Sequence, residues 1–122
     1  MLGRIKQIAV SVADLEKSKG FYRDKLGLKL LFEAPPGLAF FDCDGIWLML
    51  SAETESEPAH EGSILYFEAQ DIQQAHDELT ERGIEFISKP HRIVDMGTWE
   101  LWLAEFRDPD GTGLALRAEV PK

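Results

Sequence analysis

Apolar and polar residues follow one another along this chain in an order that occurs twice. Residues 4–12 alternate between apolar side chains and polar or small ones, which is the period of a half-buried strand. Asp14 is suited to cap a helix, apolar residues then recur at helical spacing, and Gly27 is placed to end the helix in a left-handed conformation. This pattern predicts a strand followed by a helix over about residues 15–26.

Three short apolar runs follow this helix and are separated by residues that favour turns. The runs cover residues 28–33, 38–43 and 46–51. Pro35, Pro36 and Gly37 lie in the first gap, and an Asp-x-Asp-Gly sequence fills the second. The first half of the chain therefore predicts the order β-α-β-β-β.

The second half repeats this order. Residues 64–69 alternate again, Asp71 can cap a second helix with Gln74 at its third position as a variant capping box, and Gly83 can end that helix. Strands are then predicted over residues 84–88, 99–106 and 112–118. The second half is therefore also predicted to be β-α-β-β-β.

Landmarks at matching places indicate that the two halves are copies of one module. Asp14 lies seven residues after Gln7, and Asp71 lies seven residues after Ile64. A second Asp-x-Asp-Gly turn, at residues 108–111, matches the one at residues 42–45. Residues 52–62 lack apolar periodicity and are acidic, as expected of a linker. We predict an α+β fold in one domain, residues 1–122, with modules over about residues 4–51 and 63–119.

Two such modules can join their sheets into one curved mixed sheet with helices on its convex side. The concave side would then form a cleft lined by both modules, which is a natural site for a small molecule. In this arrangement the aspartates of the two Asp-x-Asp-Gly turns cap backbone groups and do not bind a metal ion.

Composition and charge narrow the classes of function. The chain carries a net charge of −9, which argues against nucleic acid as a partner because nucleic-acid binders cluster Lys and Arg. The apolar runs are too short to span a membrane and residues 1–6 do not resemble a signal peptide, so we expect a cytoplasmic protein without a membrane partner. The single cysteine, Cys43, excludes an intramolecular disulfide, and it has no histidine nearby in sequence to activate it as a nucleophile.

The chain resembles the vicinal oxygen chelate superfamily, which includes glyoxalase I, bleomycin-resistance and fosfomycin-resistance proteins and extradiol dioxygenases. The resemblance covers essentially the whole chain and rests on the motifs at residues 12–18, 21–28, 71–72 and 106–111. It implies the two-module fold, a concave ligand site and a homodimer, in which modules are sometimes exchanged through the linker. Most members have Asn after the second turn glycine, where this chain has Thr112.

Metal-dependent members of the superfamily bind a divalent ion with His, Gln or Glu on the first and last strands of each module. The resemblance carries these positions onto Gln7, Met49, Ile64 and Ala115. Only Gln7 has a side chain that could bind a hard or borderline divalent cation. We therefore predict no metal site of the family type and no cofactor.

Strand parity and the resemblance together predict which side chains line the cleft. The predicted ligand-binding residues are Gln7, Ser11, Trp47, Met49, Tyr66, His91, Trp99, Glu105 and Arg117. Among them, His91 lies in residues 89–98, which are predicted to form a loop that could close over the cleft or remain solvated. Glu68 and Glu105 are weak candidates for an acid and base pair, and the alternative is that they pair with Arg117 or Arg107.

Three functions remain open at this stage. The first is a metal-free protein that binds an aromatic or amphipathic organic molecule, as the aromatic lining favours. The second is a metal-dependent lyase, isomerase or dioxygenase with an off-pattern site built from Gln7, Glu68, Glu105 and His91. The third is a regulatory or structural dimer whose cleft is filled by its own side chains.

Overall fold

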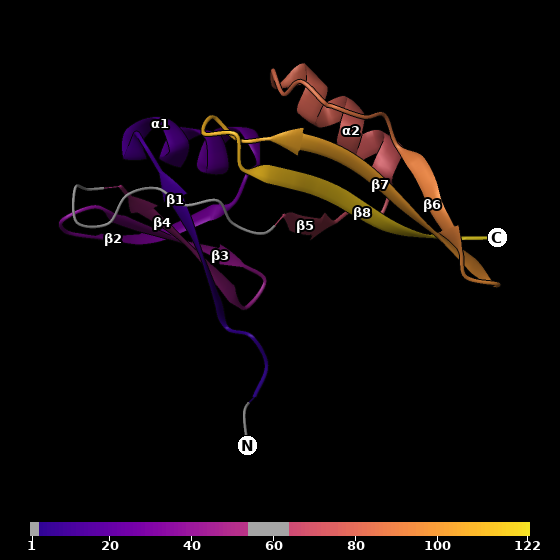
Figure 1. Ribbon diagram of the computed structural model, residues 1–122, viewed down its shortest axis with the longest axis horizontal. Helices are drawn as coiled ribbons and strands as arrows, with labels where there is room; N and C mark the ends of the chain where they lie inside the picture. Colours follow the sequence, from indigo (N-terminus) through magenta and orange to yellow (C-terminus); the bar gives the residue numbers. More distant parts are fainter. Residues whose placement is uncertain (1–2, 54–63) are drawn as a thin grey trace. The chain divides into compact units, whose positions relative to one another are not determined.

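The computed structural model describes residues 3–53 and 64–122, which fall into two compact units, Met1–Gly62 and Ser63–Lys122 (Figure 1). Unit one contains β1 (Gln7–Val12), α1 (Leu15–Gly20), the π-helical turn η1 (Phe21–Lys25), β2 (Lys29–Ala34), β3 (Leu38–Cys43) and β4 (Ile46–Ala52). Its sheet has the strand order β1-β4-β3-β2, in which β1 and β4 are parallel and the other pairs are antiparallel.

Unit two repeats this topology. It contains β5 (Leu65–Glu68), α2 (Ile72–Glu81), β6 (His91–Asp95), β7 (Trp99–Arg107) and β8 (Gly113–Pro121). The strand order is β5-β8-β7-β6, again with a parallel pair between the first and last strands. The predicted fold class and the two tandem βαβββ modules are therefore confirmed.

The predicted helix caps are present in both units. The Asp14 carboxylate accepts a hydrogen bond of 3.1 Å from the Lys17 backbone N–H, and Asp71 accepts one of 3.0 Å from Gln74. Such bonds satisfy backbone donors that the first helical turn leaves without partners. The Gln74 side chain itself donates to Glu78, in the next turn of the helix.

The first helix differs from its prediction because its second half is π-helical. The prediction was one helix over about residues 15–26, but α1 ends at Gly20 and η1 follows it. The Leu26 N–H donates to the carbonyl oxygen of Phe21, five residues earlier, at 3.1 Å. Phe21 and Tyr22 are both buried, and a turn widened by one residue accommodates two adjacent buried rings.

The predicted strand over residues 84–88 is wrong. This segment forms an isolated bridge between Phe86 and Phe106, and the strand that pairs with β7 is β6, at residues 91–95. Ile84 is buried and Phe86 packs between His76 and Phe106, with ring centroids 4.3 and 5.1 Å apart. The apolar alternation therefore reflects packing against α2 and not a strand ladder.

Each unit buries one face of its sheet under its own helix. In unit one α1 packs on β3 and β4, and the Tyr22 and Phe41 ring centroids are 6.1 Å apart. In unit two α2 packs on β7 and β8, where Phe106, Leu114 and Leu116 are buried. Because strand residues alternate between faces, the neighbours of these residues point to the opposite side, called below the helix-distal face of each sheet.

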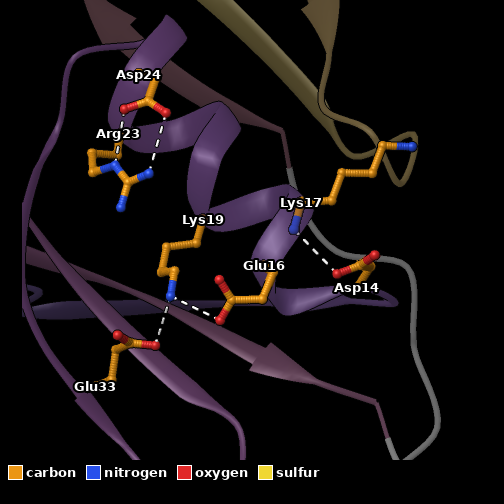
Figure 2. Close-up of polar contacts among 7 residues, drawn as sticks. All are labelled: Asp14, Glu16, Lys17, Lys19, Arg23, Asp24 and Glu33. Atoms are coloured by element: carbon orange, nitrogen blue, oxygen red, sulfur yellow. Dashed lines mark hydrogen bonds and ion pairs between the residues drawn. The ribbon is translucent and has the colours of Figure 1, made fainter.

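A buried lysine connects the first helix to the edge of its sheet (Figure 2). The Lys19 ammonium lies 2.9 Å from Glu16 on α1 and 3.0 Å from Glu33 on β2. These hydrogen bonds raise the pKa of Lys19 above its usual value, with the bond to Glu16 contributing most. Arg23 and Asp24 form a separate ion pair, with Nε 2.9 Å from the carboxylate.

The second Asp-x-Asp-Gly turn is held by its first aspartate, as the sequence predicts. The Asp108 carboxylate accepts hydrogen bonds from the backbone N–H groups of Asp110 at 2.8 Å and Thr112 at 2.9 Å. In unit one, Asp42 accepts a bond of 3.0 Å from Gly45. Both aspartates therefore serve as turn caps.

The predicted linker, residues 52–62, falls mostly outside the described residues; its first residue, Ala52, ends β4. Within the described ranges, the structure contains no helix of the length and apolar character needed to cross a membrane.

Candidate functional site

The helix-distal face of sheet one carries four of the predicted ligand-binding residues. The register places Gln7 of β1 beside Trp47 of β4, and Ser11 beside Ser51. Met49 lies between them on β4, and its sulfur is 3.7 Å from the Gln7 side-chain nitrogen. The pairing of β1 with β4 therefore places these four residues on the same face of the sheet, as the alternation in the sequence predicts.

Three aromatic rings on this face form what we call the aromatic cluster: Phe32, Phe40 and Trp47. The Phe32 and Phe40 rings stack with centroids 4.5 Å apart and planes 17° apart. The Trp47 ring lies 5.5 and 5.7 Å from them at steep angles of 74° and 69°. Phe40 is buried, whereas Phe32 and Trp47 are 44% and 40% exposed. Two large rings therefore remain open to a ligand.

Sequence reasoning missed Phe32 and Phe40. A bulge between Leu30 and Phe32 changes the side of β2 that its residues occupy, so that Leu30 lies beside Phe41 and Phe32 lies beside Phe40. In a regular strand, Leu30 and Phe32 would share a face. Parity along β3 could have placed Phe40 beside Met49, but the bulge in β2 has no evident signal in the sequence.

The helix-distal face of sheet two carries the other predicted site residues. Glu105, Ala115 and Tyr66 lie side by side on β7, β8 and β5. A second row across the same strands contains Leu103, Arg117 and Glu68, and His91 of β6 lies beside Leu103. Trp99 is paired with Pro121 at the far end of β7. This face is richer in hydrogen-bonding groups than that of sheet one.

Glu68 and Glu105 do not lie side by side in this arrangement. They are on strands separated by β8 and are offset by two residues, which corresponds to about 12 Å between their Cα atoms. Arg117 pairs with Glu119 at 3.2 Å, and Arg107 donates to the Gly111 carbonyl at 3.5 Å. Between residues 64 and 122, neither glutamate forms an ion pair with these arginines. An acid and base pair would need the two side chains to converge across β8.

His91 lies in a strand, which corrects the prediction of a loop over residues 89–98. It begins β6, and its side chain is exposed. Its Nδ1 atom is 2.7 Å from the backbone carbonyl oxygen of Lys89. Pairing with β7 holds the backbone of this segment in place, so His91 is presented by a sheet edge and not by a free loop.

The four positions implied for metal ligands do not offer a suitable donor set. Ile64 is aliphatic and 47% exposed, and Ala115 is a fully buried methyl group. Gln7 supplies one amide oxygen, and Met49 a soft thioether. Over the described ranges, no three His, Cys, Asp or Glu side chains are grouped as a metal site. These residues do not fit the divalent ion of the metal-dependent relatives.

Cys43 is half-buried at the end of β3, where the first turn begins. Burial raises the pKa of its thiol above the ordinary value, and the neighbouring Asp42 carboxylate raises it further. Since the thiolate is the reactive form, both effects disfavour a nucleophilic role.

Comparisons with known proteins place these features in a family. The model of the Glyoxalase/Bleomycin resistance protein/Dioxygenase superfamily matches residues 4–116. The uncharacterized protein YraH of Bacillus subtilis is 34% identical over 120 residues, covering 88% of this chain and 91% of YraH. The metallothiol transferase FosB of Lysinibacillus sphaericus is 43% identical over only 51 residues, 42% of this chain and 36% of FosB.

Solved structures share the fold. The crystal structure of a glyoxalase/bleomycin resistance protein/dioxygenase from Nocardioides has a TM-score of 0.78 and 29% sequence identity. The match covers 98% of this chain and 85% of that one.

Proposed function

This chain belongs to the Glyoxalase/Bleomycin resistance protein/Dioxygenase superfamily, and within that family we propose that it binds an aromatic or amphipathic organic molecule without a metal ion. The observation that carries the proposal is the aromatic cluster. Phe32 and Trp47 stay about two-fifths exposed although each ring could gain stability by burial. A flat organic ring placed against them would supply that burial.

The chemistry around the cluster supports this choice. On the helix-distal face of sheet one, Met49 lies beside Phe40 and Ala9 lies beside Met49, and both are apolar. Pockets for organic molecules combine apolar and aromatic walls with a few polar groups, and Gln7 supplies one such group beside Trp47. The donor set of Gln7, Met49, Ile64 and Ala115 gives no corresponding support for a metal ion.

A ligand screen tests the proposal. Aromatic and amphipathic compounds are screened by thermal shift, and hits are measured by calorimetry on the wild type and on Phe32→Ala and Trp47→Ala. We expect each variant to weaken binding by about tenfold or more, since aromatic contacts contribute roughly 0.5–1.5 kcal/mol beyond buried area. Trp102→Phe is the matched control, because Trp102 lies on the other face of sheet two with its N–H bonded to Glu100.

Two results would refute the proposal. The first is that no compound stabilises the protein unless a divalent ion is present. The second is that hits bind the two cluster variants as tightly as they bind the wild type.

The local likeness to FosB keeps a metal-dependent enzyme as the second candidate. This would be a lyase, isomerase or dioxygenase whose off-pattern site uses Gln7, Glu68, Glu105 and His91. Elemental analysis of protein purified without chelator separates the two candidates. Stoichiometric divalent metal, lost in His91→Ala or Glu105→Ala, would favour the enzyme.

A homodimer and a cytoplasmic location remain predictions. Light scattering after size exclusion measures the mass in solution, and a mass of about 28 kDa, twice the 13.8 kDa chain, is expected.

A further inference from the structure

We propose that the organic ligand carries a protonated amino group beside its aromatic ring, and that Asp42 and Gln7 of unit one bind this group. The inference rests on the proposed function, because it names the chemical class of the molecule that binds the aromatic cluster. All residues that carry it belong to unit one. It would fail, while the proposed function stands, if aromatic molecules bound equally well with and without an amino group.

Polar side chains lie next to the aromatic cluster on the helix-distal face of sheet one. The register places Asp42 of β3 beside Trp47 of β4, and Trp47 beside Gln7 of β1. Two residues away from Asp42 along β3, Phe40 lies beside Phe32. Direct cross-strand neighbours have Cβ atoms about 4.5–5.5 Å apart, and diagonal neighbours are about 7–8 Å apart. A ring bound on the cluster therefore holds its substituents within reach of both polar side chains.

Gln7 presents its amide oxygen on this face. Its side-chain nitrogen is 3.7 Å from the Met49 sulfur, and a thioether sulfur accepts hydrogen bonds but has no proton to donate. This contact therefore orients the amide with its N–H group toward the sulfur. Between residues 3 and 53, no group donates a hydrogen bond to the amide oxygen, and the side chain is exposed. Gln7 thus offers a ligand an acceptor.

Asp42 has a second carboxylate oxygen that the turn does not use. Its Oδ1 atom accepts the Gly45 N–H at 3.0 Å. Lys29 lies opposite Asp42 on β2, and the Arg4 guanidinium is 4.0 Å from the position that a Cβ atom at Gly45 would take. In the described part of unit one, neither cation forms an ion pair with Asp42. The carboxylate can therefore accept a charge-assisted hydrogen bond from an ammonium group.

The exposed rings favour the same ligand charge. The faces of Trp and Phe rings attract cations, so an ammonium group beside Trp47 gains from the ring as well as from Asp42. An anionic group at this place would instead meet the Asp42 carboxylate and the Gln7 amide oxygen. Lys29 lies beyond Asp42, on β2, and is not a direct neighbour of Trp47. This part of the face therefore suits an amine better than a carboxylate or a phosphate.

Three probes with the same rings test the inference at neutral pH. They are 2-naphthylmethylamine, which is protonated, the neutral 2-naphthalenemethanol and the anionic 2-naphthylacetate. Calorimetry on the full chain should show the amine binding about five- to tenfold more tightly than the alcohol, and the acid binding most weakly. The advantage of the amine should shrink between about 0.02 M and about 0.5 M salt, because salt screens exposed charges. The affinity for the alcohol should not fall.

Asp42→Asn is the variant that removes the charge and keeps the turn. Its amide retains an oxygen for the Gly45 N–H, and circular dichroism checks that the fold is unchanged. We expect the advantage of the amine over the alcohol to fall to about twofold or less, with the affinity for the alcohol unchanged. Asp44→Asn is the matched control, since it removes one carboxylate from the same turn at an exposed position outside β3 and β4. It should leave the advantage unchanged.

Several outcomes would overturn the inference. One is equal binding of the amine and the alcohol to the wild type, and another is an unchanged advantage in Asp42→Asn. An advantage lost equally in Asp44→Asn would indicate long-range attraction and not a bound amino group. If Phe32→Ala and Trp47→Ala weaken all three probes but the amine has no advantage, the proposed function stands and only this inference fails. If no probe and no screened compound binds, both fail.

Discussion

Replacing Asp108 tests whether the Asp-Pro-Asp-Gly segment is a turn or a ligand site. In the structure Asp108 is 5% exposed, and its carboxylate accepts hydrogen bonds from the N–H groups of Asp110 and Thr112 at 2.8 and 2.9 Å. A hydrogen bond to a charged group contributes about 1.5–3 kcal/mol net. Since Asp110 is exposed and water can replace part of its bond, we expect Asp108→Ala to lower the free energy of unfolding by about 2–4 kcal/mol.

Two further substitutions separate the contribution of the charge from that of the hydrogen bonds and compare the two turns. Asp108→Asn keeps an acceptor oxygen and loses the charge, so we expect a loss of about 1 kcal/mol. Asp42→Ala removes the matching cap in unit one, where one bond of 3.0 Å to Gly45 lies in an exposed turn. Its expected cost is about 0.5–1.5 kcal/mol.

Urea unfolding followed by both circular dichroism and tryptophan fluorescence measures these differences. The reasoning would be wrong if Asp108→Asn cost as much as Asp108→Ala, or if Asp42→Ala cost more than either. A third result would also refute it: stabilisation of the wild type, but not of Asp108→Ala, by Ca²⁺ or Mg²⁺. That result would make the carboxylate a metal ligand.

Three further substitutions probe the cap, the packing and the ion pair of the two units. Asp71→Ala should lower the free energy of unfolding in urea by about 1 kcal/mol, as for other N-cap residues. A loss of less than a few tenths of a kcal/mol would contradict the role of Asp71 as a cap. Phe41→Ala should cost about 3–5 kcal/mol because the ring is fully buried; a cost near 1 kcal/mol would indicate that the site collapses. The Trp102 N–H and then the Arg92 guanidinium hold the pKa of Glu100 below its ordinary value. This stabilisation is present above the ordinary pKa of about 4.3 and is lost as pH falls through the lower folded value. The urea midpoint of Glu100→Gln should therefore approach that of the wild type in acid, and a constant difference would argue against the effect.

The sequence was sufficient for features that depend on local chemistry. The residues of β3 agree with the predicted bounds, and the caps at Asp14 and Asp71 depend only on a side chain three residues from its backbone partner. Gly27 and Gly83 both have positive φ, 74° and 94°, which few other residues adopt readily. These features depend only on residues within about one helical turn of each other, so the sequence alone predicts them.

Features decided by pairing between strands were not predictable. All five residues of β6 are exposed, so no contrast between apolar and polar positions marks the strand. It forms because β7 offers a partner edge. The β6 ladder contains a bulge between Arg92 and Val94, opposite Trp102 and Leu101. The bulge in β2 lies opposite Phe41 and Phe40, close to the first Asp-x-Asp-Gly turn, so the two bulges are at different places in their ladders. Each bulge changes the side of the sheet that the following residues occupy, which simple alternation does not predict.

Ala115 occupies the position on β8 where the resemblance implies a metal ligand. It is fully buried although it lies on the helix-distal face, directly between Tyr66 and Glu105. Ala115→Glu would place here one of the residue types, His, Gln or Glu, that the resemblance implies for a metal ligand at this position. It would also place two carboxylates opposite each other and require space that the neighbours occupy, so we expect a loss of about 1–3 kcal/mol in urea unfolding. Ala9→Glu is the matched control, because Ala9 is exposed on the corresponding face of sheet one and should cost little. If Ala115→Glu were as stable as the wild type, the inference that the neighbours leave no space for a longer side chain at this position would be wrong.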